Sequence, residues 1–505
     1  MRGPKMARYK AIQRSGMFIP VMLSEQIQPG TFEFALDHLI DHELDLSALD
    51  AKFHNDEVGA SAYDPRVMLK IVLFAYSRGL ISSRKIEQAC SQNVLFIAIS
   101  GDSQPSYTHI AKFVRELGHE VQTLFSQVLM TCDRIGLIGK TMFAIDGVKL
   151  PANASKERSG THTELAHRAA RLDKAAAKII SAHQAQDEHG HVDLDAQRQR
   201  RITELQREAQ ATRDFIARAP KRLNAKGQEL KTNLTDPDSA KMATAKGVIQ
   251  GYAAQAAVDS AHQIIVAAEV IGSGSEQSML LPMIDKSAPV RRSDTLITAD
   301  AGYHSDANLK ALHAQGIPAM VADNRMRQRD ERIDNAHHRA KGDPLYDKTE
   351  VKTLKFFRPE DFRFVDDRSA TCPAGKTLSG NGSRYLTPRG MRYQRFEAQA
   401  QDCMHCQLRT RCQRDITSPR GRQVSRFEPK RADEHDPSER MRRAIDSPQG
   451  RRLYSQRIAT VEPVFANIRH HKRMSRFTLR GRAKVSTQWN LFCLVHNIEK
   501  IAHCG

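Results

Sequence analysis

Three acidic residues, Asp146, Asp300 and Glu462, have the side chains and surroundings that suit metal-dependent chemistry. The first two end apolar runs and precede small residues, so their carboxylates can reach a cleft without entering the core. Such hard oxygen ligands suit Mg²⁺ or Mn²⁺. Two ions roughly 3.5–4 Å apart can activate the attacking oxygen and stabilise the leaving oxygen of a phosphodiester. A single strand-end Asp is usually a turn or cap residue, so the prediction depends on all three occurring together.

An alternating pattern of strands and helices has to position the two aspartates. Strands are expected at residues 137–150, 248–258, 263–271, 295–299 and 318–322, and helices at 277–284 and after Ser305. Asp146 is expected at the polar end of the first strand. Strands that first form a meander and are then separated by helices predict the mixed sheet of an α/β, ribonuclease H-like core.

Glu462 belongs to a predicted helix near the carboxyl end. Its expected packed stripe consists of Tyr454, Ile458, Val461, Phe465 and Ile468. Glu462 lies one position beside this stripe, which places it at the edge of the helix–sheet contact. Pro463 follows directly, so the helix is expected to kink or to begin anew there.

Two helical segments flank or interrupt this core. Residues 1–135 are expected to be helical, with Asp64–Pro65 starting one helix and Ser106 starting another. This region fits either a helix-turn-helix DNA reader, with Lys112 and Arg115 pointing outward, or a plain helical bundle. Residues 155–230 predict a helical hairpin insertion. The histidines of the hairpin (His183, His189 and His191) resemble a metal cluster, but they are expected to be solvent-exposed loop histidines.

Four of the eight cysteines have metal-binding spacing. Cys403 and Cys406 form a CxxC pair, Cys412 follows closely, and Cys372 begins a CPAG turn. Four thiolates can close a tetrahedral Zn²⁺ site, whose role would be structural. Reduced thiols without metal are the alternative, and His405 is a substitute ligand. The remaining cysteines (Cys90, Cys132, Cys493 and Cys504) are expected to be core or incidental residues.

The formal charge of +19 favours a polyanionic partner. Basic residues are dense between Arg409 and Lys484, and this stretch is expected to contact nucleic acid. No apolar run approaches the ~18 residues of a membrane span. The basic amino terminus lacks the apolar region of a secretory signal, so a cytoplasmic, nucleoid-associated protein is expected. Lys149 and His304 flank the aspartates and are either phosphate contacts or surface residues, whereas Trp489 is expected to anchor the core.

Several long motifs make the chain resemble the DDE transposases of bacterial insertion sequences, in the subgroup with a helical amino-terminal domain and a Cys-rich insertion. The motifs are PGTFEFALDHLIDHELDLS, SSRKIEQAC, AIDGVKLPANASKERSGT, TDPDSAKMATAKGVIQGYAAQAAVDS, TADAGYHS and VEPVFANIRHHKRMSRFTLRG. The resemblance implies that Asp146, Asp300 and Glu462 form the catalytic triad and hold two Mg²⁺ or Mn²⁺ ions. It also implies the zinc-binding cysteine pattern.

The chain departs from its relatives in the Glu462 helix. Tyr454 and Arg457 are offset by one from the usual spacing, and Arg469 stands where lysine is common. Arg469 is therefore the preferred phosphate contact over Arg457. The other expected DNA contacts in this region are Lys472, Arg473 and Arg476.

The resemblance implies an enzyme that binds the terminal inverted repeats of its element, cleaves the DNA and joins the 3′-OH ends to target DNA. Holding two ends calls for a homo-oligomer, at least a dimer. Four regions are expected: 1–135, 136–325, the Cys-rich basic insertion 326–445, and 446–505 with Glu462. A ribonuclease H-like nuclease that cleaves without joining, and an inactive DNA-binding regulator, are the alternatives.

Overall fold

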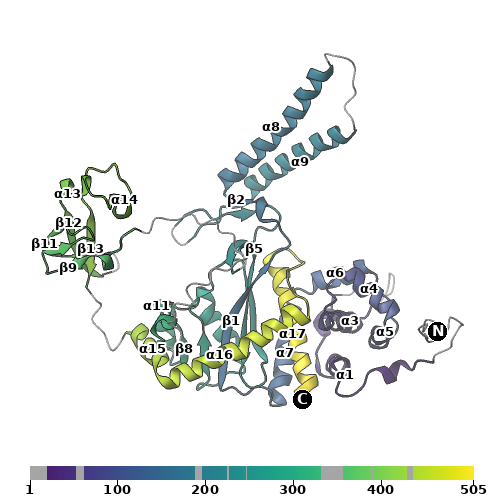
Figure 1. The fold of residues 1–505 in the computed structure, drawn as a ribbon. Helices are drawn as coiled ribbons and strands as arrows, with labels where there is room; N and C mark the ends of the chain where they lie inside the picture. The colour runs from purple at the N-terminus through teal and green to yellow at the C-terminus, as the bar shows by residue number, and fades with distance from the viewer. Residues whose placement is uncertain are drawn as a thin grey trace, which may run out of the picture. The chain divides into compact units, whose positions relative to one another are not determined.

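The computed structural model describes residues 20–52, 62–187, 196–224, 227–245, 247–330, 356–387, 390–428 and 436–504. The chain forms two compact units (Figure 1). The first combines Met1–Met326 with Ala444–Gly505, and the second is Arg327–Arg443. The second unit is therefore inserted into the sequence of the first. The predicted division into four regions remains a prediction.

The amino-terminal region is helical, as predicted. Asp64 accepts a hydrogen bond from the Arg66 N–H and Pro65 occupies the first turn, and Ser106 caps a later helix in the same way. The elements are a 3₁₀ turn Leu23–Gln26, α1 Phe32–His38, a π turn Leu39–Glu43, α2 Ser47–Asp50, α3 Pro65–Ser77, α4 Ser83–Gln92, α5 Val94–Ser100, α6 Tyr107–Glu116 and α7 Glu120–Arg134.

A mixed sheet forms the centre of the first unit. Its strands are β1 Met142–Pro151, β4 Ala240–Thr244, β5 Gly247–Asp259, β6 Ile265–Ile271, β7 Leu296–Ala299 and β8 Ala319–Val321. The order is β4-β5-β1-β7-β8, with β6 also paired to β5. β1 is antiparallel to β5 and parallel to β7, and β7 is parallel to β8. The five predicted strands are confirmed, whereas β4 was not predicted.

Helices before and after the insertion complete this unit. They are α10 Leu280–Lys286, preceded by a 3₁₀ turn Gln277–Met279, then α11 Asp306–Ala314, α16 Pro448–Ala466, a π turn Asn467–His471 and α17 Arg482–Cys504. The helix α15 Pro437–Asp446 begins in the sequence of the second unit and ends in that of the first. α16 packs on β1, β5 and β7, and α17 packs on β6, α1, α3 and α7 (Figure 1). No helix in the described ranges is long and apolar enough to cross a membrane.

The carboxyl-terminal helix α17 is anchored by two buried side chains. Trp489 is fully buried, as predicted, and its Nε1 donates a hydrogen bond to the Gln255 carbonyl at 3.0 Å. Asn497 bonds both the N–H and the carbonyl of Ile265 at 2.9 Å, so it satisfies backbone groups of β6 that no neighbouring strand takes up. The last helix therefore belongs to the core of the unit.

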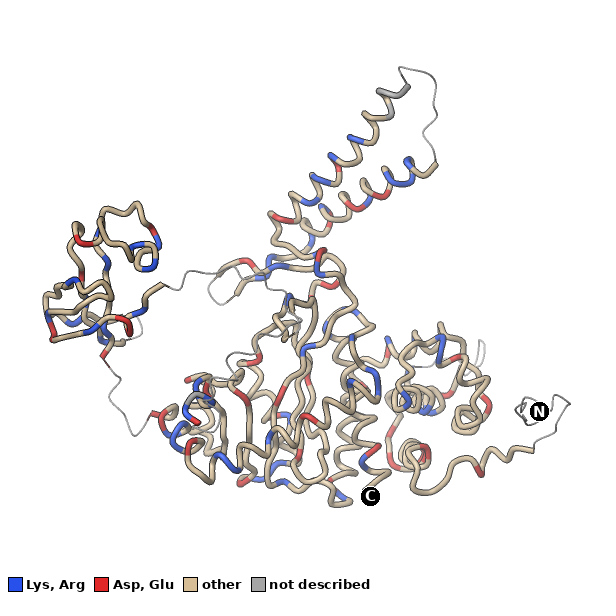
Figure 2. Tube along the Cα trace, in the orientation of Figure 1, with Lys and Arg blue, Asp and Glu red and all other residues tan. Residues whose placement is uncertain are grey.

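The predicted helical hairpin is confirmed between β1 and β5. Its helices are α8 His162–Asp187 and α9 Ala196–Arg218, and a short ribbon of β2 Ser159–Gly160 and β3 Thr232–Asn233 lies at its base. Ala176, Ile202 and Leu205 form a small apolar core between the helices. Both helices carry basic residues interspersed with fewer acidic ones (Figure 2). The side chain of His183, and His189 and His191 entirely, lie outside the described residues.

The second unit contains a five-stranded antiparallel sheet of order β13-β12-β11-β10-β9. Its elements are a 3₁₀ turn Pro359–Asp361, β9 Arg363–Phe364, β10 Ser369–Thr371, β11 Thr377–Leu386, β12 Arg392–Ala398, α13 Ala400–Met404, α14 Arg409–Cys412 and β13 Gln423–Phe427. Phe362, Leu378, Phe396 and Val424 form its core, against which Cys372, Cys403 and Cys412 pack.

Candidate active site

The strand register brings Asp146 and Asp300 together. β1 and β7 run parallel, and their last paired residues are Ile145 and Ala299. Asp146 and Asp300 are the next residues on the two strands, so both carboxylates emerge at the same edge of the parallel pair. The prediction that Asp146 ends its strand is wrong, because β1 continues to Pro151 along β5.

Asp146 is held by a buried arginine and by its own backbone. Arg457 Nη1 donates to Asp146 Oδ2 at 2.7 Å, and the Gly147 N–H donates to Oδ1 at 2.8 Å. The exposed fractions of the two charged side chains are 10% for Arg457 and 17% for Asp146. The Arg457 guanidinium also lies 5.7 Å from the centre of the Tyr454 ring. Arg457 is therefore part of the site.

Burial raises the pKa of Asp146, and the nearby Asp300 carboxylate adds to this effect. Arg457 and the Gly147 N–H favour the charged form but do not fully compensate. Asp300 itself accepts a hydrogen bond from the Gly302 N–H at 2.8 Å. Two neighbouring carboxylates in a partly buried site repel each other unless positive charge stabilises them, and Arg457 supplies part of that charge.

A third carboxylate at this position, Glu276, was not predicted from the sequence. Burial raises its pKa, Lys149 opposes the shift, and Asp300 and Asp146 raise it further, so Glu276 lies within electrostatic reach of both aspartates. It precedes the 3₁₀ turn Gln277–Met279. The segment GSGSEQS around it is polar and rich in glycine and serine, so it carries no periodic signal. Only its position in the connection between β6 and α10 could have indicated that Glu276 belongs to the site.

Glu462 lies elsewhere on its helix. The side chain is exposed on α16, and no contact with Asp146 or Asp300 is found. The predicted packed stripe is wrong at Ile458, which is 47% exposed, whereas the neighbouring Arg457 is 8% exposed. Val461, Phe465 and Ile468 are buried as predicted. On this face of α16, Arg457 rather than Glu462 reaches Asp146.

Pro463 does not start a new helix. α16 runs through it to Ala466 and continues into the π turn. A proline cannot bond the carbonyl four residues earlier, which here belongs to Ala459. The Gln263 side chain supplies the missing donor, with Nε2 at 3.2 Å from the Ala459 oxygen. A side chain from the β5–β6 connection thereby compensates for the proline.

The flanking residues Lys149 and His304 have different roles. Lys149 is half-buried and its charge acts on Glu276. The His304 carbonyl accepts a hydrogen bond from Gln277 Nε2 at 2.7 Å, so its backbone takes part in holding the site. Throughout the described ranges, no three His, Cys, Asp or Glu side chains already stand in a metal-binding arrangement.

The predicted DNA contacts divide into exposed and buried residues. Lys112 and Arg115 on α6, and Arg469, Arg473 and Arg476 after α16, are exposed. The prediction for Lys472 is wrong. Its side chain is 1% exposed and pairs with Glu499, so it cannot reach a phosphate. Burial lowers the pKa of Lys472, although Glu499 opposes the shift.

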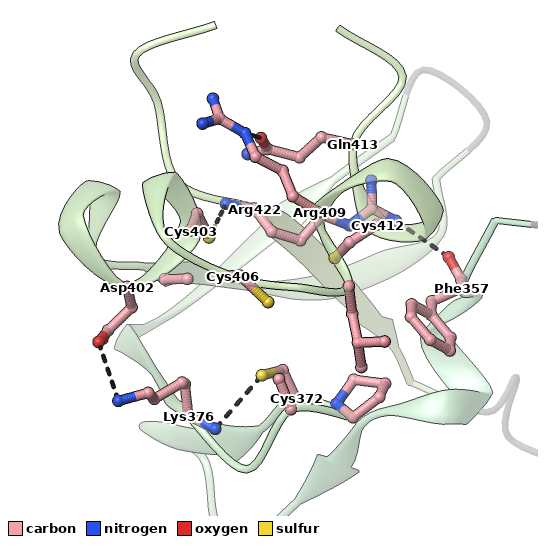
Figure 3. Close-up of a pocket in the computed structure, with 14 residues that line it drawn as sticks. Phe357, Cys372, Lys376, Asp402, Cys403, Cys406, Arg409, Cys412, Gln413 and Arg422 are labelled. Atoms are coloured by element: carbon pink, nitrogen blue, oxygen red, sulfur yellow. Dashed lines mark hydrogen bonds and ion pairs between the residues drawn. The ribbon is translucent and has the colours of Figure 1, made fainter. Parts of the chain in front are cut away.

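The four predicted cysteines of the second unit line one pocket (Figure 3). The Lys376 N–H points to Cys372 Sγ and the Arg422 N–H to Cys403 Sγ, both at 3.3 Å. Burial raises the pKa of Cys412, Arg422 opposes the shift, and the other three cysteines add to it. The other cysteines divide as predicted, since Cys90, Cys132 and Cys493 are buried and Cys504 is exposed.

Comparison with protein families gives two matches. Residues 371–502 match the family "Transposase DDE domain", and residues 21–116 match the family "Transposase domain (DUF772)". These two families are typical of DDE transposases of bacterial insertion sequences, so the predicted resemblance is confirmed. The first match includes Arg457 and Glu462, whereas Asp146 and Asp300 lie outside both. Among curated proteins, none matches the chain.

Proposed function

We propose that this chain is a DDE transposase that binds the terminal inverted repeats of its insertion sequence, cleaves the DNA and transfers the freed ends to target DNA. One observation carries the proposal beyond the two family matches. Asp146 and Asp300 follow Ile145 and Ala299, the last pair of two adjacent parallel strands. The strand order β6-β5-β1-β7-β8 supports the ribonuclease H-like core that the resemblance implies.

Asp146 and Asp300 would hold Mg²⁺ or Mn²⁺, with Glu462 as the third ligand that the resemblance implies. The donor set fits, because several carboxylates lie close together in a partly buried site, where Arg457 acts on Asp146 and Lys149 acts on Glu276. The ions would supply an activated attacking oxygen and stabilise the leaving oxygen. Asp146 and Asp300 would hold these ions in place, while the exposed Arg469, Arg473 and Arg476 would contact phosphates.

The Cys-rich unit would carry a structural Zn²⁺ ion on Cys372, Cys403, Cys406 and Cys412. The four thiol side chains meet in one pocket, and two backbone N–H groups already point at sulfur atoms. This is the donor set of a closed tetrahedral zinc site. We assign it no role in catalysis.

A Mg²⁺-dependent cleavage and strand-transfer assay on the DNA that flanks the gene tests the proposed function. Asp146→Ala, Asp300→Ala and Glu462→Ala are compared with Asp294→Ala, an exposed carboxylate near β7 that serves as the matched control. We expect joined products from the wild type and the control. Each of Asp146→Ala, Asp300→Ala and Glu462→Ala should abolish them while DNA binding survives. Cleavage without joining would identify a nuclease, and binding without chemistry would identify a regulator.

A further inference from the structure

Glu276 lies beside Gly147 and Gly302, which stand one residue after Asp146 and two residues after Asp300. A β-carbon built on Gly147 would come within 2.7 Å of Glu276 Oε1, and one built on Gly302 would come within 3.2 Å of Oε2. The Glu276 carboxylate therefore spans the space beside Asp146 and Asp300. Any larger residue at Gly147 would displace it, since Gln255 Nε2 would also lie only 2.3 Å away.

Neighbouring hydrogen bonds fix the segment that carries Glu276. Gln277 Nε2 donates to the His304 carbonyl, and Asn308 Nδ2 donates to the Gln277 and Tyr303 carbonyls, each at 2.7 Å. Asn308 is only 7% exposed. These bonds tie the start of α10 to the loop that follows Asp300, so Glu276 and Asp300 belong to one supported structure.

A buried amide points into the same space. Gln255 is completely buried, and its Oε1 accepts a hydrogen bond from the Tyr303 hydroxyl. Its Nε2 lies beside Gly147 and faces the Glu276 carboxylate, whose charged form it favours, but it makes no well-aligned hydrogen bond with a described residue. Buried polar groups normally have a well-aligned partner, so this loosely matched amide leaves a donor for a further group in the site, such as a water molecule.

Charge counting indicates a cation. Asp300 raises the pKa of Asp146, and both aspartates raise the pKa of Glu276, whereas Arg457 opposes the shift at Asp146 and Lys149 opposes it at Glu276. An excess of negative charge in a site of low dielectric is costly unless a cation neutralises it. Glu462 adds nothing here, because it is exposed and lies five residues beyond Arg457, about 140° around the helix.

We infer that Glu276 is a metal ligand of this site and supplies, with Asp146 and Asp300, the carboxylate set that holds the divalent ion before DNA binds. The catalytic meaning of this assignment rests on the proposed function. Its geometry does not, because the three carboxylates and the buried amide of Gln255 define the site without reference to DNA.

Mn²⁺ binding to the full-length protein without DNA tests the inference, with free Mn²⁺ followed by electron paramagnetic resonance. Glu276→Gln keeps the shape of the side chain and removes its charge, and Asp294→Asn, at an exposed carboxylate near β7, is the matched control. We expect Glu276→Gln to weaken Mn²⁺ binding about 10- to 100-fold, with Asp294→Asn unchanged. Wild-type binding by Glu276→Gln, or an equal loss in Asp294→Asn, would overturn the inference.

Two further comparisons keep the result interpretable. If Glu276→Gln does not fold, as judged by the emission of Trp489, Glu276→Asp takes its place, because it keeps the charge but withdraws both oxygens. Weaker Mn²⁺ binding by Glu276→Asp would then support the inference, and wild-type binding would overturn it. Mn²⁺ binding that depends on Glu276 in a protein that neither cleaves nor joins DNA would uphold the inference and refute the proposed function. DNA transposition by the wild type, together with Mn²⁺ binding that Glu276→Gln leaves unaffected, would uphold the proposed function and refute the inference.

Discussion

Replacing Arg457 with methionine should destabilise the metal-free protein strongly. Methionine keeps much of the side-chain volume but leaves Asp146 without its 2.7 Å partner. Both side chains are at most 17% exposed, so the pair falls in the range of buried rather than surface ion pairs. Removing one partner of a buried pair costs about 3–5 kcal/mol, whereas a surface pair contributes ~0–1 kcal/mol.

Urea unfolding followed by the emission of Trp489 measures this loss. Trp489 is the single tryptophan and is fully buried in the first unit, so the signal reports on the unit that contains Arg457. Arg452→Met is the matched control, because Arg452 is exposed on the same helix and its loss should cost less than about 0.5 kcal/mol.

Mn²⁺ adds a second criterion. A metal ion would replace part of the missing positive charge, so Mn²⁺ should stabilise Arg457→Met more than the wild type. The reasoning is refuted if the unfolding free energy of Arg457→Met in the absence of metal equals that of Arg452→Met. It is also refuted if Mn²⁺ stabilises Arg457→Met no more than the wild type.

Three further predictions concern residues away from the aspartates. Burial lowers the pKa of His496 from 6.5 to about 4. The unfolded chain therefore binds more protons between these pH values, and the free energy of unfolding should fall by roughly 2 kcal/mol from pH 6.5 to pH 5. His496→Gln should flatten the pH dependence of urea unfolding in this range, and an unchanged slope would contradict the prediction. Lys472→Met should lose about 3 kcal/mol of stability because Glu499 loses its ion-pair partner, but the folded variant should keep its DNA affinity. Arg473→Met should instead reduce the slope of log K for DNA binding against log salt concentration by ~1. Weaker DNA binding by folded Lys472→Met would show that Lys472 reaches DNA. Cys403→Ser should remove zinc measured by mass spectrometry, whereas the exposed-cysteine control Cys504→Ser should keep it; equal zinc contents would argue against the cysteine site.

The sequence was most informative where local pattern and packing agree. The strands around Asp146 and Asp300 alternate with helices in a regular order, and the register of parallel strands then brings the two aspartates together. The caps at Asp64 and Ser106 were equally predictable, because they satisfy backbone groups only two or three residues away. Local chemistry of this kind can be recognised without the fold.

The errors arose where a distant partner decides burial. Arg457 is buried because it pairs with a residue 311 positions earlier, and this pairing turns Ile458 outward against its hydrophobicity. Lys472 stands in a basic run, but Glu499 draws it into the core. Glu276 lies in a polar turn with no periodic pattern. Charge pairing across the fold could not be predicted from composition or spacing.

The insertion of the second unit has a consequence for the order in which the protein is made. The ribosome releases β1 to β8 first, then the 117 residues of Arg327–Arg443, and only afterwards α16 and α17. At roughly 5–20 residues per second, the interval is on the order of 6–23 s. During this time β6 lacks Asn497, and Asp146 lacks Arg457. A nascent or truncated chain that ends before α16 therefore lacks Arg457, so the completed site is restricted to nearly full-length molecules.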